Sequence, residues 1–229
     1  MFSEMTKQLW SNGNLMLGVW ETVYMTVLST VFAYVIGLPL GVLLHITSPG
    51  GIKPVKWLNA VLGFIVNIFR SIPFIILMVA MLPVAKFTVG TSMGNKAMIV
   101  MLIIAAAPYV ARMVESSLKE VPEGTVEAAQ AMGTPTFSLI TKVLIPEAKP
   151  SLITGAVISM VTILGYSAMA GTIGGTGLGQ IAISFGYQRF NNDLIWICVL
   201  LTIVIVQIIQ EVGTRIARAT DKRVKTKNH

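Results

Sequence analysis

The sequence is poor in charged residues and nearly free of cysteine. Charged residues make up 12% of its 229 positions, whereas a soluble globular domain carries roughly a quarter. The one cysteine, Cys198, lies inside an apolar run, where we expect a small buried core residue and no disulfide framework. The only histidines are His45 and His229, and with Cys198 they form no metal-ligand cluster, so we expect no metal site on this chain.

Motifs for catalysis are missing as well. The chain has no G-x-x-x-x-G-K-[ST] phosphate loop, because the glycine-rich segment Gly171–Gly179 lacks the following Lys-Ser/Thr. It also lacks an intramembrane His-Glu-x-x-His motif or Ser/Lys dyad, so we expect no catalytic residue and no cofactor here. We interpret Gly171–Gly179 as irregular backbone at the outer mouth of a membrane domain. The N-terminus has no basic segment followed by a small-residue cleavage site, and we expect no cleaved signal peptide.

Long apolar runs are abundant. The mean hydropathy is +0.76, and 54% of the residues are hydrophobic. A helix needs about 20 apolar residues to cross a bilayer, and its backbone polar groups must be satisfied internally. The sequence therefore predicts an all-α, polytopic transmembrane bundle of about five spans. We place the spans at about 22–46, 57–83, 95–114, 151–170 and 194–212.

The basic residues predict the orientation of these spans. With the N-terminus outside, twelve Lys and Arg residues fall in inside segments and four in outside segments, with Arg70 unassigned. The positive-inside rule then favours N-out, C-in. We expect an extracytoplasmic segment 1–17, a membrane domain 18–218 with a cytoplasmic loop 115–150, and a basic cytoplasmic tail 219–229. This tail suits anionic lipid better than nucleic acid.

The cytoplasmic loop carries signals for a first short helix over Pro122–Met132. Pro122 fits the first turn, and Glu123 suits the positive end of the helix dipole. Gly133 fits the position after the C-terminus, where a left-handed conformation favours glycine. A second short helix is expected from Thr136 to Ile145.

Thr134 is expected to cap this second helix, with Pro135 at its first position and Pro146 as its stop. The loop is therefore predicted to be a helix–turn–helix on the cytoplasmic face. A folded loop at that place indicates a surface for a protein partner.

The same loop resembles the EAA loop of ABC-importer permeases, which reads E-A-A, three residues, G, nine residues, I, one residue, L-P. Five positions match in identity and spacing, and two apolar positions carry Val and Ile instead of Ile and Leu. The resemblance implies that the loop forms a coupling helix seated in a groove of a cytoplasmic ATPase. The residues at these seven positions are Glu127, Ala128, Ala129, Gly133, Val143, Ile145 and Pro146.

Further segments are similar to the methionine ABC-transporter permeases, over about residues 18–218. This resemblance implies a homodimer in the bacterial cytoplasmic membrane, two ATPase subunits that bind ATP and Mg²⁺, and an extracytoplasmic methionine-binding protein. The segments are Val19–Thr26, Asn67–Leu77, Ala106–Leu118 and Gly165–Ile181.

Arg70 is a strong charge inside an apolar stretch, and such residues usually face a bundle interior or an aqueous cavity. Ser71 and Pro73 indicate a kink or break beside it. We weigh a gating or dimer-interface role against snorkelling or pairing with a freed carbonyl, with Asn67 as a same-face partner. Arg112 is expected to snorkel at the end of the third stretch.

The fourth stretch has few bulky aliphatic residues and offers candidates for the translocation path: Met160, Tyr166, Ser167 and Met169. Ordinary helix packing, with Gly165 at an interface, is the alternative for this set.

Two other functions stay open. The chain could serve an ABC importer for another amino acid or small solute, because a binding protein normally sets the substrate. A membrane scaffold or an intramembrane enzyme is the alternative of another class. The missing acid/base constellation argues against the enzyme, and the folded loop argues against an inert scaffold.

Overall fold

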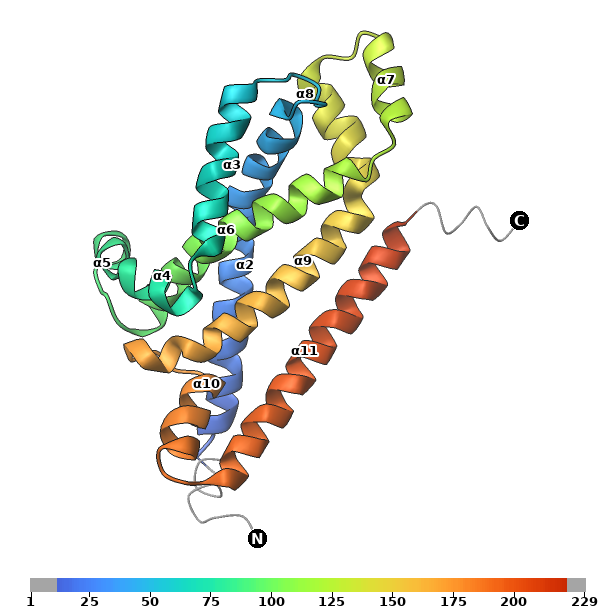
Figure 1. The fold of residues 1–229 in the computed structure, drawn as a ribbon. Helices are drawn as coiled ribbons and strands as arrows, with labels where there is room; N and C mark the ends of the chain where they lie inside the picture. Colours follow the sequence, from blue (N-terminus) through green and yellow to red (C-terminus); the bar gives the residue numbers. More distant parts are fainter. Residues whose placement is uncertain (1–11, 222–229) are drawn as a thin grey trace. The chain divides into compact units, whose positions relative to one another are not determined.

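The computed structural model describes residues 12–221 (Figure 1). These residues are helical almost throughout, and no strand occurs among them. The predicted segments 1–17 and 219–229 fall largely outside this range. The helices are α2 (Asn14–Thr47), α3 (Lys56–Ser71), α4 (Phe74–Ala80), α5 (Leu82–Val89), α6 (Gly94–Lys119), α7 (Glu123–Ala131), α8 (Thr136–Leu139), α9 (Ile145–Ser167), α10 (Leu178–Gln180) and α11 (Asn192–Thr220). Two π-helical segments, Ile140–Leu144 and Ile181–Tyr187, and a 3₁₀ segment, Ala168–Ile173, continue them.

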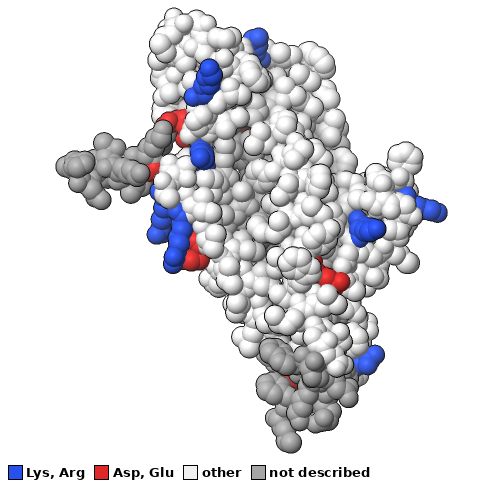
Figure 2. Space-filling view, turned by 180° about the vertical axis from the view of Figure 1, so that it is seen from behind, with Lys and Arg blue, Asp and Glu red and all other residues white. Residues whose placement is uncertain are grey.

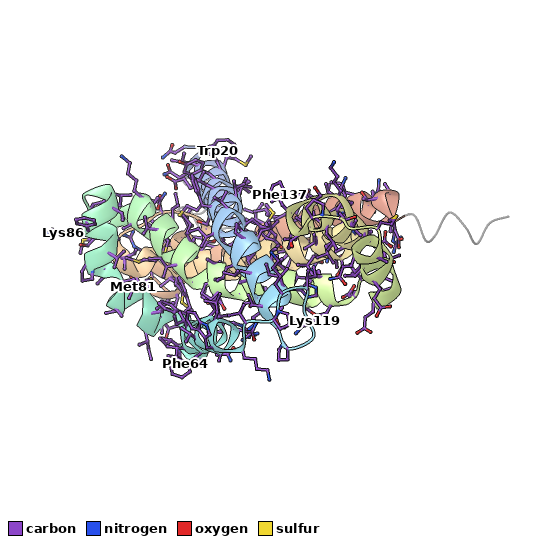
Figure 3. The ribbon with its side chains drawn as sticks, turned by 90° about the horizontal axis from the view of Figure 1, so that it is seen from above. Trp20, Phe64, Met81, Lys86, Lys119 and Phe137 are labelled. Atoms are coloured by element: carbon purple, nitrogen blue, oxygen red, sulfur yellow. The ribbon has the colours of Figure 1, made fainter. Side chains whose placement is uncertain are left out.

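Among residues 12–221, four helical segments are long and apolar enough to cross a membrane, and the count is five if the bent pair α3–α4 is one broken span. This confirms the all-α, polytopic prediction. Charged side chains are few on the face drawn in Figure 2, where uncharged residues make up most of the surface. Large apolar side chains such as Trp20 on α2 and Phe64 on α3 are exposed and project outward (Figure 3), as lipid contact requires.

The predicted break beside Arg70 is confirmed. The α3 helix ends at Ser71, and α4 begins at Phe74 after Pro73. Pro73 has φ −55° and ψ 136°, which is an extended conformation and cannot continue a helix.

Several helices run past the predicted apolar stretches. The first begins at Asn14, α6 continues to Lys119, and α9 already begins at Ile145. Hydropathy marks only the part of a helix that lies in hydrocarbon, whereas the backbone hydrogen bonds continue into polar flanks. The connection outside α6 and α9 is therefore 120–144, shorter than the predicted loop 115–150.

The described residues form two compact units. The first unit contains residues 12–32, 72–106 and 160–209, and the second contains residues 33–71, 107–159 and 210–221. The first unit has a buried core that includes Cys198, as predicted for that residue. The core residues are Leu15, Leu178, Ile181, Leu194 and Cys198.

Within the first unit, two side chains hold the glycine-rich segment 171–179. Asn95 accepts from the Thr176 amide at 2.7 Å and donates to the Thr176 hydroxyl at 2.7 Å. Thr22 Oγ1 accepts from the Leu178 amide at 2.9 Å. Gly174 has φ +71°, so the segment is a fixed turn of irregular backbone, as its glycine content predicts.

In the second unit, α2 and α6 approach each other closely. A Cβ at Gly37 would lie 2.8 Å from the Ala107 carbonyl oxygen, and Gly41 faces Ala111 in the same way. Small residues at a crossing let membrane helices pack backbone to backbone. Beside this contact, buried Leu44, Val66 and Ala111 join α2, α3 and α6 in one apolar cluster.

Candidate functional site: the loop between α6 and α9

The first half of the loop has the predicted form (Figure 1). The α7 helix covers Glu123–Ala131, directly after Pro122 at its N-cap. Gly133 has φ +72° and donates its amide to the Gln130 carbonyl at 2.9 Å. The Thr134 amide then donates to the Ala129 carbonyl at 3.2 Å. These bonds satisfy free carbonyls at the end of α7 and reverse the chain, as a left-handed C-terminal glycine does.

The second half differs from the prediction. Pro135 is the N-cap of α8, and Thr134 makes no side-chain cap. The helix also does not stop at Pro146: it passes through the π segment Ile140–Leu144 into α9. The Ile145 amide bonds to the Ile140 carbonyl, five residues back. This wider turn relieves the clash that a proline ring makes with the carbonyl four residues before it, so the helix can include Pro146.

The three EAA residues do not share one face. Glu127 and Ala128 are exposed, whereas Ala129 is only 3% exposed. Ala129 therefore packs inside the loop, although it belongs to the motif that the resemblance assigns to the coupling helix. Glu127 and Ala128 remain available to a partner.

Two residues that the motif does not contain are the most exposed apolar groups of the loop. Met132 is 78% exposed and Phe137 is 77% exposed, on either side of Gly133; Figure 3 labels Phe137. Exposed large apolar side chains at a folded turn are typical of interaction sites. The sequence alone does not single them out, because the same connection contains other large apolar residues, such as Val121 and Leu139, which are buried.

Glu127 also lines a groove of about 660 Å³ between α7 and the connection from α2 to α3. The opposite wall includes Ser48 and Gly51, and Glu123 and Lys119 stand in the same groove. Lys119 already pairs with Glu115 at 2.7 Å. The groove is therefore left with acidic character from Glu123 and Glu127, which suits a basic group.

The structure changes the predicted surroundings of Arg70. Arg70 is exposed and, within residues 12–221, forms no hydrogen bond or ion pair. Asn67, its predicted partner, instead accepts a hydrogen bond from Arg112 Nη2 at 3.0 Å. Arg112 therefore does not simply snorkel: its guanidinium also pairs with Glu115 at 2.7 Å.

The predicted path residues of the fourth stretch lie in the first unit. Tyr166 stacks on Phe74, and Ser167 is buried and donates to the Leu164 carbonyl at 2.7 Å. The Met169 carbonyl accepts from Thr172 at 2.7 Å, and Met160 is half-buried. These contacts favour helix packing for Ser167 and leave the role of the others in a path as a prediction. Within the part of the chain that the structure describes, no three metal-ligating side chains converge.

Comparison with known proteins places this geometry in a family. Residues 33–226 match the family described as "Binding-protein-dependent transport system inner membrane component". The chain is 47% identical to the probable D-methionine transport system permease protein MetI of Vibrio cholerae, over 93% of this chain and 95% of that protein. It is similar, with a TM-score of 0.91 and 47% identity, to a chain in an inward-facing structure of the MetNI methionine ABC transporter, over 96% and 100% of the two chains. An amino acid ABC transporter solved with histidines shares the fold at 17% identity and a TM-score of 0.77, over 96% and 100%. The chain therefore belongs to the family of binding-protein-dependent transport system inner membrane components.

Proposed function

We propose that this chain is the permease subunit of an ATP-driven ABC importer for methionine. Its family membership and its 47% identity to a permease named for D-methionine transport carry this proposal. The match spans 95% of that relative, so it includes the membrane helices as well as the loop. The chain acts as a translocation subunit and not as an enzyme.

We propose the loop between α6 and α9 as the docking site for the ATPase that supplies the energy. The observation that supports it is the turn at Gly133, which presents Met132 and Phe137 to the surroundings. A protein interface usually has apolar anchors at its centre and polar or charged groups at its rim. Glu127 supplies that charge, in a groove of acidic character.

The rest of the proposed assembly follows from the same function. Two copies of the chain form the translocation path, two cytoplasmic ATPase subunits bind ATP and Mg²⁺, and an extracytoplasmic binding protein delivers methionine. In the bacterial cytoplasmic membrane the N-terminus lies outside and the C-terminus inside. The positive-inside rule supports this orientation, since basic residues are concentrated after Arg215.

A growth experiment tests the function in cells. A methionine-requiring bacterium without its own methionine transporters is given this chain together with its ATPase and binding protein. We expect growth on low methionine, in the L or the D form, and no growth when the chain is omitted. Failure to grow on methionine, together with rescue of a requirement for another amino acid, would favour the importer for a different solute.

A further inference from the structure

Glu115 is a buried charge near the cytoplasmic end of α6. Its side chain is only 7% exposed, and each carboxylate oxygen has its own cation. Arg112 Nη1 donates to Oε2 at 2.7 Å, and Lys119 Nζ donates to Oε1 at 2.7 Å. Both partners lie on the same helix, three residues before and four residues after Glu115.

The arginine of this network also reaches α3. Arg112 Nη2 donates to the Asn67 side-chain oxygen at 3.0 Å and to the Gly63 carbonyl at 3.2 Å. A Cβ at Gly63 would lie 3.3 Å from Nη2, so the glycine lets the guanidinium reach the α3 backbone. We name the set of Asn67, Arg112, Glu115 and Lys119 the Glu115 bracket.

Stability alone is a poor reason for such a bracket. Removing two charges from water costs several kcal/mol, and an apolar pair of similar volume often does as well. Apolar packing already joins α2, α3 and α6 here through buried Leu44, Val66 and Ala111. The bracket fixes the orientation of α3 relative to α6. The planar guanidinium of Arg112 donates its hydrogen bonds in fixed directions, whereas apolar contacts have no preferred direction.

The Glu115 bracket lies next to α7, the first helix of the loop. Lys119 is the last residue of α6, and α7 begins at Glu123. Leu118 and Val121 are buried on the way, so the connection is packed and can transmit a displacement. Lys119 also lines the groove that contains Glu127. A movement of α7 therefore reaches the bracket through one short, fixed turn.

We propose that the Glu115 bracket is a positioning element that couples movement of the α7 loop to α3, with Arg112 and Glu115 as its central residues. The proposal rests on the function proposed above, in which the ATPase moves α7. Without the bracket, α7 still docks and ATP is still hydrolysed. The movement of α7 then reaches α3 only through non-directional apolar contacts, and transport per ATP falls.

The test uses the complete transporter in proteoliposomes and measures methionine transported per ATP hydrolysed. We expect Glu115→Gln to lower this ratio about 2- to 30-fold, the range of 0.5–2 kcal/mol for residues that modulate coupling. ATP hydrolysis should persist, the apparent KM for the loaded binding protein should not change, and Glu115→Asp should restore part of the ratio. The matched control is Glu211→Gln, which breaks an exposed i, i+4 pair with Arg215 and should leave the ratio unchanged.

An unchanged ratio in Glu115→Gln would overturn the proposal. This includes the case in which transport and ATP hydrolysis fall together with the amount of assembled transporter, since that is a structural role only. If Glu115→Gln does not assemble, Arg112→Lys decides, because lysine keeps the charge but loses the fork, and an unchanged ratio there also overturns the proposal. Methionine uptake by the unmodified transporter is measured in a separate experiment. Its absence would contradict the proposed function, whatever the Glu115 bracket does.

Discussion

Phe74 and Tyr166 stack with their ring centroids 4.6 Å apart and their planes within 7°. Phe74 is the first residue of α4, and Tyr166 lies one residue before the end of α9. The stack fixes the start of the short helix α4 directly after the break at Pro73. It also means that the Tyr166 ring is held as a packing partner.

Tyr166→Ala should therefore destabilise the permease. Loss of the stack costs about 0.5–1.5 kcal/mol in addition to the buried area lost. Thermal unfolding in detergent should show a lower midpoint for this variant and a wild-type midpoint for Tyr166→Phe, which keeps the stacked ring. Tyr187→Ala, at a position 73% exposed, is the control and should change little. Equal midpoints for Tyr166→Ala and Tyr187→Ala would contradict the packing role.

Gly133→Ala should weaken transport by straining the turn after α7. A left-handed residue other than glycine costs roughly 1–2 kcal/mol, and no atom lies within 4 Å of the added Cβ, so the strain comes from φ alone. Gly133→Asn should be milder, because asparagine tolerates this conformation. Gly124→Ala, inside α7, also has open space but no positive φ, and uptake should stay normal. If both alanine variants behave alike, backbone strain at Gly133 is not the cause.

Phe137→Ala and Met132→Ala should weaken binding of the ATPase. Anchors of this type contribute more than about 1 kcal/mol when they are central in an interface, which is at least about fivefold in Kd. Titration of the purified ATPase onto the permease in nanodiscs measures the change. Phe87→Ala, in α5, removes an even more exposed ring on the predicted outer side and serves as control. If both loop variants bind the ATPase with an unchanged Kd, the turn is not the docking site.

Gly37→Ala should destabilise the crossing of α2 and α6. The new Cβ would lie 2.8 Å from the Ala107 carbonyl and 2.7 Å from Val110 Cγ1, and overpacking of this kind costs about 1–3 kcal/mol. Gly165→Ala, within α9 and without neighbours in 4 Å, provides the comparison. We expect a lower unfolding midpoint for Gly37→Ala only. The same loss at both positions would point to a general effect of filling helical glycines.

Local chemistry explains which parts of the loop could be predicted. Pro122 and Gly133 act on their own backbone: Gly133 lies where the sequence predicts, and Pro122, predicted in the first turn, lies one residue before it, at the N-cap of α7. Pro146 was predicted to stop a helix, which is its local effect, but the π segment Ile140–Leu144 carries the helix past it. Because π turns are rare, a proline at this position predicts the end of a helix and not a π turn that accommodates the ring.

Contacts between distant segments explain the rest. Asn67 and Arg112 are 45 residues apart, and each alone reads as a polar residue in an apolar stretch. Only the packing of α3 against α6 brings them together. In the same way, the sequence cannot tell that Ala129 turns inward while Ala128 stays exposed, since this depends on how α7 lies on its own loop.

Uptake of radiolabelled methionine into proteoliposomes shows directly whether this chain transports methionine. The vesicles contain this chain with its ATPase, and the binding protein and ATP are supplied on their proper sides. We expect accumulation that needs ATP, the binding protein and this chain together, and that excess unlabelled methionine abolishes. Absence of methionine uptake, while the same vesicles accumulate a different solute with ATP, would contradict the proposed function.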